Sequence, residues 1–155
     1  MSNFGDILMF DISTVFAKLL IAAVLGGLIG WERESRGRPA GLRTHLLVCV
    51  GVTLMMLVSE HIFVHYQGYK SDSVLRIDPA RIAAQVVTGV GFLGAGTIMR
   101  FRASIRGLTT AASLWIVSGI GLAVGSGFIL PAVFTAIIAI TTLILLPKAE
   151  GEMKR

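Results

Sequence analysis

Five stretches of the chain are almost free of charged side chains, and each is about long enough to cross a lipid bilayer as a helix. They cover residues 12–30, 42–63, 80–99, 109–125 and 128–146. A transmembrane helix needs roughly 20 apolar residues, because the hydrocarbon core is about 30 Å thick. The pattern therefore predicts an all-α membrane protein with about five transmembrane helices, in a single domain over residues 1–155.

Turn-forming residues mark several ends of these stretches. The last two are separated only by Gly125-Ser126-Gly127, and one helix over both would be far too long to cross once. We therefore expect a tight helical hairpin there. Asp78 and Pro79 supply an N-cap and a first-turn proline for the third helix, and Pro147 follows the fifth.

Basic residues are distributed unequally between the two sides that five spans would create. Ten fall on one side and three on the other, with Lys18 inside the first stretch. The ten are Arg33, Arg36, Arg38, Arg43, Arg100, Arg102, Arg106, Lys148, Lys154 and Arg155, and the three are Lys70, Arg76 and Arg81. The positive-inside rule then places the N-terminus outside and the C-terminus in the cytoplasm.

The composition supports a lipid environment. Hydrophobic residues make up 54% of the chain and charged residues only 15%, against about 25% in soluble domains. The net charge of +5 does not indicate nucleic acid, because the basic residues form short clusters between apolar stretches without interleaved aromatic residues. The expected surroundings are a lipid bilayer and other membrane proteins.

Lys18 lies about a third of the way into the first stretch. Two interpretations are open: an intramembrane ion site, or a lysine whose ammonium group reaches the outer headgroups along its aliphatic stem.

Two segments, 66 residues apart, share a short pattern. Gly41-Leu42 with Thr44 opens the second stretch, and Gly107-Leu108 with Thr110 opens the fourth. The same offset relates Gly30 to Gly96 and Arg36 to Arg102. The pattern predicts a parallel repeat of helices 1–2 and 3–4 about an axis along the membrane normal.

Glycines recur at spacings that permit close contact between helices. Small residues four apart allow backbones to approach in lipid, where association depends on close packing. The glycines concerned are Gly26, Gly30, Gly89, Gly91, Gly94, Gly96, Gly121 and Gly125. Residues 89–94 also match a dinucleotide-binding pattern, but no strand precedes them. The contacts can lie within the chain or between chains, and we expect a homo-oligomer, with a dimer favoured.

The densest polar cluster joins the first two stretches. Glu32, Arg33 and Glu34 follow Trp31, and Arg43-Thr44-His45 begins the next stretch. One interpretation is an interfacial cap that sets topology. The other is a fixed ion-pair network, from Glu32 or Glu34 to Arg43, that presents a surface to a partner. Neither a metal site, a cofactor nor a catalytic nucleophile–base–carboxylate set is expected.

Three ordered motifs resemble the MgtC/SapB family of bacterial inner-membrane proteins. The first joins Gly-Leu-Ile-Gly-Trp-Glu-Arg-Glu (27–34) to Pro-Ala-Gly-Leu-Arg-Thr-His (39–45). The second joins residues 78–85 to Gly-Phe-Leu-Gly-Ala-Gly-Thr-Ile (91–98), and the third covers residues 106–115. The resemblance covers about residues 12–146. The candidate functional cluster comprises Glu32, Arg33, Glu34, Arg43, Thr44, His45, Asp78, Arg81, Arg106, Thr109 and Thr110.

The resemblance implies a protein of the bacterial inner membrane without enzymatic activity, linked to growth at low magnesium and, in some members, to virulence. The name-giving branch is thought to restrain the membrane ATP synthase by direct contact. Many members continue into a cytoplasmic domain after the last helix, whereas this sequence stops eight residues after Pro147. Two functions are therefore considered: a regulator that binds other membrane proteins, and a transporter or channel for a cation such as Mg²⁺, or a subunit of one.

Overall fold

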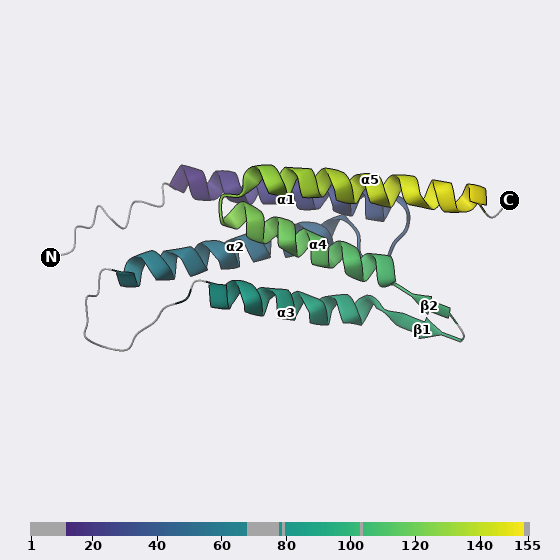
Figure 1. Cartoon of the computed structure of the whole chain (residues 1–155), viewed down its shortest axis with the longest axis horizontal. Helices are drawn as coiled ribbons and strands as arrows, with labels where there is room; N and C mark the ends of the chain where they lie inside the picture. Colours follow the sequence, from purple (N-terminus) through teal and green to yellow (C-terminus); the bar gives the residue numbers. More distant parts are fainter. Residues whose placement is uncertain (1–11, 68–77, 79, 103, 154–155) are drawn as a thin grey trace.

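The computed structural model describes residues 12–67, 78, 80–102 and 104–153. Five helices form an elongated bundle in which successive helices run in opposite directions (Figure 1). A short antiparallel β-hairpin joins the third helix to the fourth. The elements are α1 (Ile12–Ser35), α2 (Leu42–Gln67), α3 (Ala80–Thr97), β1 (Met99–Phe101), β2 (Ser104–Arg106), α4 (Leu108–Gly125) and α5 (Ile129–Met153).

Among the described residues, four of the five helices are long and apolar enough to cross a membrane: α1, α2, α4 and α5. The chain is therefore a multi-pass membrane protein. The exception is α3, which carries Arg81, Gln85 and Thr88 in its first half and is less apolar for that reason. The number of helices predicted from the sequence is confirmed, whereas the crossing of the membrane by α3 stays a prediction.

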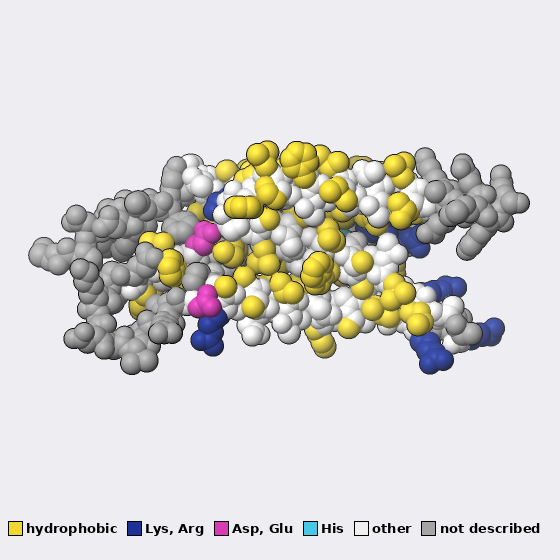
Figure 2. All heavy atoms as spheres, in the orientation of Figure 1, with side chains coloured by type: hydrophobic (Ala, Val, Ile, Leu, Met, Phe, Trp, Pro, Cys, Tyr) yellow, Lys and Arg dark blue, Asp and Glu magenta, His cyan; other side chains and the backbone are white. Residues whose placement is uncertain are grey.

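The two ends of the bundle differ in charge. The α1–α2 turn, the β-hairpin and the end of α5 lie at one end, which we call the basic end (Figure 1). Figure 2 shows most of the visible Lys and Arg atoms there, in dark blue. This arrangement agrees with the expected grouping of basic loops, while the orientation across the membrane stays a prediction.

Helix α4 occupies the centre of the bundle. It contacts each of the other four helices, and half of its apolar stretch is buried. Its buried face includes small residues, among them Ser113, Ser118, Gly121 and Gly125. Leu114, Val117 and Ile120 are buried with them, but many other large apolar side chains are exposed. The α1 series Leu20, Val24, Leu28 and Trp31 is an example. This distribution suits a bundle in lipid, where small residues mediate helix contacts.

Helix α2 is packed closely between α1 and α4. A Cβ atom at Gly26 would lie 2.6 Å from Cβ of Cys49, and one at Gly30 would lie 2.7 Å from Cα of Leu42. On the α4 side, a Cβ at Gly121 would lie 2.6 Å from the carbonyl oxygen of Cys49. A Cβ at Gly125 would be equally close to Cβ of Met56. Both pairs of glycines therefore lie at helix contacts within the chain.

The other glycines behave differently. Gly94 makes an ordinary contact with Ala111 of α4, since its Cβ would lie 3.6 Å from Cβ of that residue. Gly89, Gly91 and Gly96 have no neighbouring atom within 4 Å of their Cβ positions. Gly96 is thus unlike Gly30, its proposed counterpart, and the parallel repeat stays a prediction.

Three local features refine the expectations. The break between the last two helices lies where it was predicted, because Gly127 adopts φ +81° and ends α4. The segment between the third and fourth predicted stretches, which was expected to be a plain connection, contributes to the β-hairpin, in which Arg100 pairs with Ile105. Helix α5 also continues beyond Pro147 instead of ending before it. Proline removes one backbone hydrogen bond but does not by itself stop a helix.

A methyl group added at Gly121 should destabilise the bundle. Gly121→Ala forces apart α2 and α4 at a backbone contact, which we expect to cost about 1–3 kcal/mol. Gly119→Ala is the matched control on the same helix, because nothing lies within 4 Å of its Cβ position. There the gain in helix propensity should be neutral or stabilising by about 0.5–1 kcal/mol. Thermal unfolding in detergent measures both, and equal melting temperatures for the two variants would contradict the close packing.

The crossing of the membrane by α3 can be tested by labelling. Arg81 and Arg100 are exposed at opposite ends of α3, whereas the natural Cys49 is buried. In intact spheroplasts, an impermeant maleimide should label Arg81→Cys but should label Arg100→Cys only after the membrane is permeabilised. Labelling of both positions from the same side would show that α3 does not cross.

Candidate functional site

The turn between α1 and α2 is closed by a carboxylate. Glu34 accepts a hydrogen bond from the backbone N–H of Leu42 at 2.7 Å, and so caps the start of α2. Gly41 makes room for this contact, since a Cβ there would lie 2.7 Å from the same Glu34 oxygen. Gly37 reverses the chain with φ +61°. The sequence Glu34 to Leu42 therefore fixes how the two helices meet.

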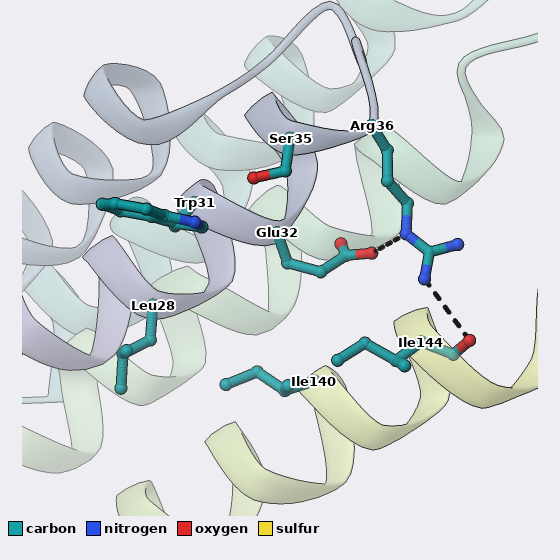
Figure 3. A pocket seen from close by; sticks show the side chains of 7 residues that line it. All are labelled: Leu28, Trp31, Glu32, Ser35, Arg36, Ile140 and Ile144. Atoms are coloured by element: carbon teal, nitrogen blue, oxygen red, sulfur yellow. Dashed lines mark hydrogen bonds and ion pairs between the residues drawn. The ribbon is translucent and has the colours of Figure 1, made fainter.

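Glu32 forms ion pairs with two arginines at and just beyond the end of α1. Its Oε2 lies 2.5 Å from Nε of Arg33. Its Oε1 lies 2.5 Å from Nε of Arg36, a contact that Figure 3 shows. The contact to Arg36 is an ion pair without hydrogen-bond alignment, so Oε1 lacks a hydrogen-bond donor. Arg33 is only 2% exposed and Glu32 9% exposed. A buried charge requires such pairing, because its removal from water is costly.

Arg36 connects this cluster to α5. Its Nη2 donates to the carbonyl oxygen of Ile144 at 3.4 Å, one turn before Pro147 (Figure 3). The pocket beneath it has apolar walls formed by Leu28, Ile140 and Ile144. Its polar rim can meet headgroups at the basic end, and its walls can meet lipid chains or a partner helix.

His45 is fully buried and joins three segments. Its Nδ1 lies 2.9 Å from the carbonyl oxygen of Gly41, and its Nε2 lies 3.0 Å from Oγ of Ser113 on α4. Because a carbonyl only accepts, Nδ1 carries a hydrogen. Ser113 Oγ also lies 2.8 Å from the carbonyl oxygen of Thr110. The serine hydroxyl has one hydrogen, so it can donate either to that carbonyl oxygen or to Nε2 of a neutral His45, but not to both. His45 thus links the α1–α2 turn to the first turns of α4.

A second polar contact lies deeper, between α2 and α4. The hydroxyl of Thr53 lies 2.9 Å from the carbonyl oxygens of both Cys49 and Gly121. It is fully buried and satisfies a carbonyl at the point of closest helix approach.

Lys18 connects α1 to α2 and α4 at the end of the bundle opposite the basic end. Its ammonium donates to the carbonyl oxygen of Gly125 at 2.6 Å and lies 3.7 Å from a carboxylate oxygen of Glu60. A cation at the C-terminal end of α4 is favoured by the helix dipole. The lysine therefore has structural partners on α4 and α2.

The candidate cluster divides between the two ends of the bundle. Glu32, Arg33, Glu34 and His45 gather at the basic end around the start of α4, where Thr109 and Thr110 lie. Arg106 is exposed on β2, and Thr44 is exposed on α2. Asp78 and Arg81 lie at the opposite end, where Asp78 caps α3 by accepting from the N–H of Ala80 at 2.9 Å.

Arg43 is not part of the ion-pair network that one interpretation of the sequence gave it. It is exposed and has no ion pair with Glu32 or Glu34 in the described part of the chain. Glu32 is occupied by two other arginines, and Glu34 by a backbone N–H. The α1-facing side of α2 contains Leu42 and His45, and helix geometry turns Arg43 away from it.

Sequence reasoning missed two members of the cluster. Arg36 stands four residues after Glu32, a spacing that is typical of helical ion pairs and could have identified it. Ser113 gave no such signal, because it lies 68 residues from His45.

The fold and the buried polar cluster define a multi-pass helical membrane protein whose basic end is held by an internal ion-pair and hydrogen-bond network. The chain belongs to the MgtC family, whose sequence profile matches residues 19–152.

Curated relatives support this assignment. An uncharacterized protein of Haemophilus influenzae is 41% identical over 142 residues, which cover 91% of this chain and 59% of that protein. The Escherichia coli K12 protein named "Putative magnesium transporter YhiD" is 49% identical over 71% of this chain and 50% of its own length. Protein MgtC of Salmonella typhimurium LT2 is 47% identical over 88% of this chain and 54% of its own length.

The chain therefore spans about half to three-fifths of the length of these relatives. No solved structure matches it significantly.

Replacing His45 should destabilise the basic end more than replacing Arg43. His45→Ala leaves a cavity and removes both side-chain hydrogen bonds, which we expect to cost about 2–4 kcal/mol. Arg43→Ala removes only an exposed side chain and should leave the melting temperature unchanged. Thermal unfolding of both variants in the same detergent provides the comparison. A greater loss of stability in the Arg43 variant would instead indicate the ion-pair network with Arg43 that the sequence left open as one interpretation.

Proposed function

We propose that this chain is a non-enzymatic regulator of the bacterial inner membrane, which acts by binding another membrane protein under magnesium limitation. The observation that carries this proposal is the outer face of α3. That face combines open glycines with exposed polar residues, in the one described helix that is less apolar than a typical membrane span.

Two adjacent rows of residues form this face, which we call the α3 face. Both rows follow helical 4-3-4 spacing and every member is exposed. The rows are Ala84, Thr88, Gly91 and Ala95, and Gln85, Gly89, Phe92 and Gly96. The opposite side of α3 contains Val90 and Gly94, which are buried in the bundle.

The α3 face suits a helix better than lipid. Gly89, Gly91 and Gly96 would let another backbone approach closely, and Phe92, which is 80% exposed, could insert into a partner's surface. Gln85 provides a hydrogen-bonding group that lipid chains would leave unsatisfied. A membrane-protein partner satisfies all three features at once.

The internal polar groups fit a regulator as well. Glu32, Arg33 and His45 form contacts with each other or with neighbouring elements, and all three lie towards the basic end. Deeper in the bundle, Thr53 is bonded to backbone carbonyls. These interactions stabilise helix contacts and give no direct support to an ion path.

Magnesium transport is the second candidate, because the name of the Escherichia coli relative proposes it. A hard cation needs several oxygen ligands. The described residues contain no group of three or more His, Cys, Asp or Glu side chains placed to hold a metal ion. Within the described part of the chain, oxygen ligands for transport would therefore have to include backbone carbonyls.

Blocking the α3 face should remove the partner while leaving the fold intact. Gly89→Leu combined with Gly96→Leu places bulk where no atom of the chain lies within 4 Å. We expect a partner captured from native membranes in mild detergent to fall at least about tenfold, since close helix approach is lost. Quantitative mass spectrometry of the captured proteins measures this change.

The control is Gly119→Leu, which adds the same bulk at another open position, on α4. It should retain the partner, and both variants should keep the wild-type melting temperature. Equal capture by the α3 variant and the wild type would rule out the α3 face as the docking surface. Mg²⁺ flux into proteoliposomes of the purified protein would favour the transport candidate.

A further inference from the structure

A cavity of about 470 Å³ opens at the basic end, beside the start of α4. Arg33 and Arg38 line it on one side and the end of α5 on another, so we call it the Arg33–Arg38 cavity. In Figure 2, Lys and Arg atoms stand on either side of a hollow at this end of the molecule. The function proposed above makes no use of this cavity.

Arg33 brings hydrogen-bond donors to the cavity. It is only 2% exposed, and its Nε is held by Glu32. A guanidinium has five N–H donors, and the two Nη groups hold four of them. Within the described part of the chain, the hydrogen bond given for this side chain runs from Nε to Glu32. Because Arg33 lines the cavity, its Nη groups can donate to a ligand that accepts hydrogen bonds there.

The charge around the cavity is positive and favours an anion. Among the described residues, Glu32 is the one carboxylate that pairs with Arg33 and Arg36, so this group of three carries a net positive charge. Arg38 adds a second positive charge at the rim, where its side chain is exposed. None of the described residues that line the cavity is acidic.

The start of α4 adds backbone donors. Gly107 is the N-cap residue and no side chain caps the helix. The first intrahelical hydrogen bond is made by the N–H of Ala111, which leaves the amides of Leu108, Thr109 and Thr110 at the mouth of an 18-residue helix. These amides and the helix dipole favour a phosphate group.

The cavity continues into an apolar groove between α4 and α5. The groove has a volume of about 300 Å³ and shares Thr109, Thr142 and Leu143 with the cavity. Ile116 and Ile138 form part of its walls. A free phosphate would fill only the polar part, whereas an acyl chain next to a phosphate would fill both.

We propose that the Arg33–Arg38 cavity binds an anionic phospholipid, with the headgroup phosphate on Arg33 and the start of α4, and one acyl chain in the apolar groove. Basic pockets between transmembrane helices are known to hold such headgroups. The proposal concerns the α4–α5 side of the basic end and is independent of the α3 face.

Native mass spectrometry of the full chain in detergent provides the test, with dioleoylphosphatidylglycerol and dioleoylphosphatidylcholine as probes. Arg38→Gln removes one phosphate-facing charge at an exposed position and should weaken phosphatidylglycerol binding about fivefold. Arg43→Gln is the matched control, because Arg43 is exposed but does not line the cavity, and it should bind as the wild type does. Thr142→Phe, at the exposed junction with the groove, should also weaken binding.

Preference for phosphatidylglycerol over phosphatidylcholine, lost in Arg38→Gln and kept in Arg43→Gln, is the expected result. Equal binding of the two lipids, or an equal loss in both arginine variants, would overturn the proposal, because it would show only nonspecific attraction. Displacement of phosphatidylglycerol by an equal concentration of inorganic phosphate would show a free-anion site and would also overturn it.

Discussion

The close approach of α2 to both α1 and α4 is the constraint on which the rest of the structure depends. Lipid chains are as apolar as leucine, so burial of large side chains gives helices little reason to associate, and backbone proximity must supply the packing. Gly26 and Gly30 provide it on one side of α2, and Gly121 and Gly125 provide it on the other. Many of the large apolar residues can then remain outside, where lipid can cover them.

Close backbones bring polar groups into the interior, and the sequence provides partners for them. Thr53 bonds the carbonyl of Gly121 at the contact of α2 with α4. His45 is held between the α1–α2 turn and Ser113, next to the position where Gly30 lets the helices meet. Unpaired polar groups would be costly in this environment. The polar network is therefore a consequence of the glycine packing, and it ties α2 to α4 and to the α1–α2 turn.

The number and order of the helices could be predicted because the bilayer fixes the length of a span. The glycine pattern also identified positions of close approach, but it could not say that Gly121 faces α2 while Gly89 faces outwards. The β-hairpin could have been inferred, since Met99, Arg100, Phe101 and Arg102 alternate between apolar and basic side chains. The contacts of the candidate site were harder to predict from the sequence. The four-residue spacing on α1 could have identified Arg36 as a partner of Glu32, whereas excluding Arg43 requires the rotation of α2, which no local pattern contains.

The arginines of the basic end fall into two kinds with different physical roles. Arg43 and Arg100 are exposed, so their charge can orient the chain in the membrane without a defined geometry. Arg33 and Arg36 are held at fixed positions by one carboxylate, where a lysine could not reproduce the planar set of donors. Because Glu32 neutralises only one of them, this group of three side chains carries a net positive charge. Any anion that bound the folded chain and not the unfolded chain would stabilise the folded state, so binding of an anionic lipid here would make the stability of this end depend on the lipid composition of the membrane.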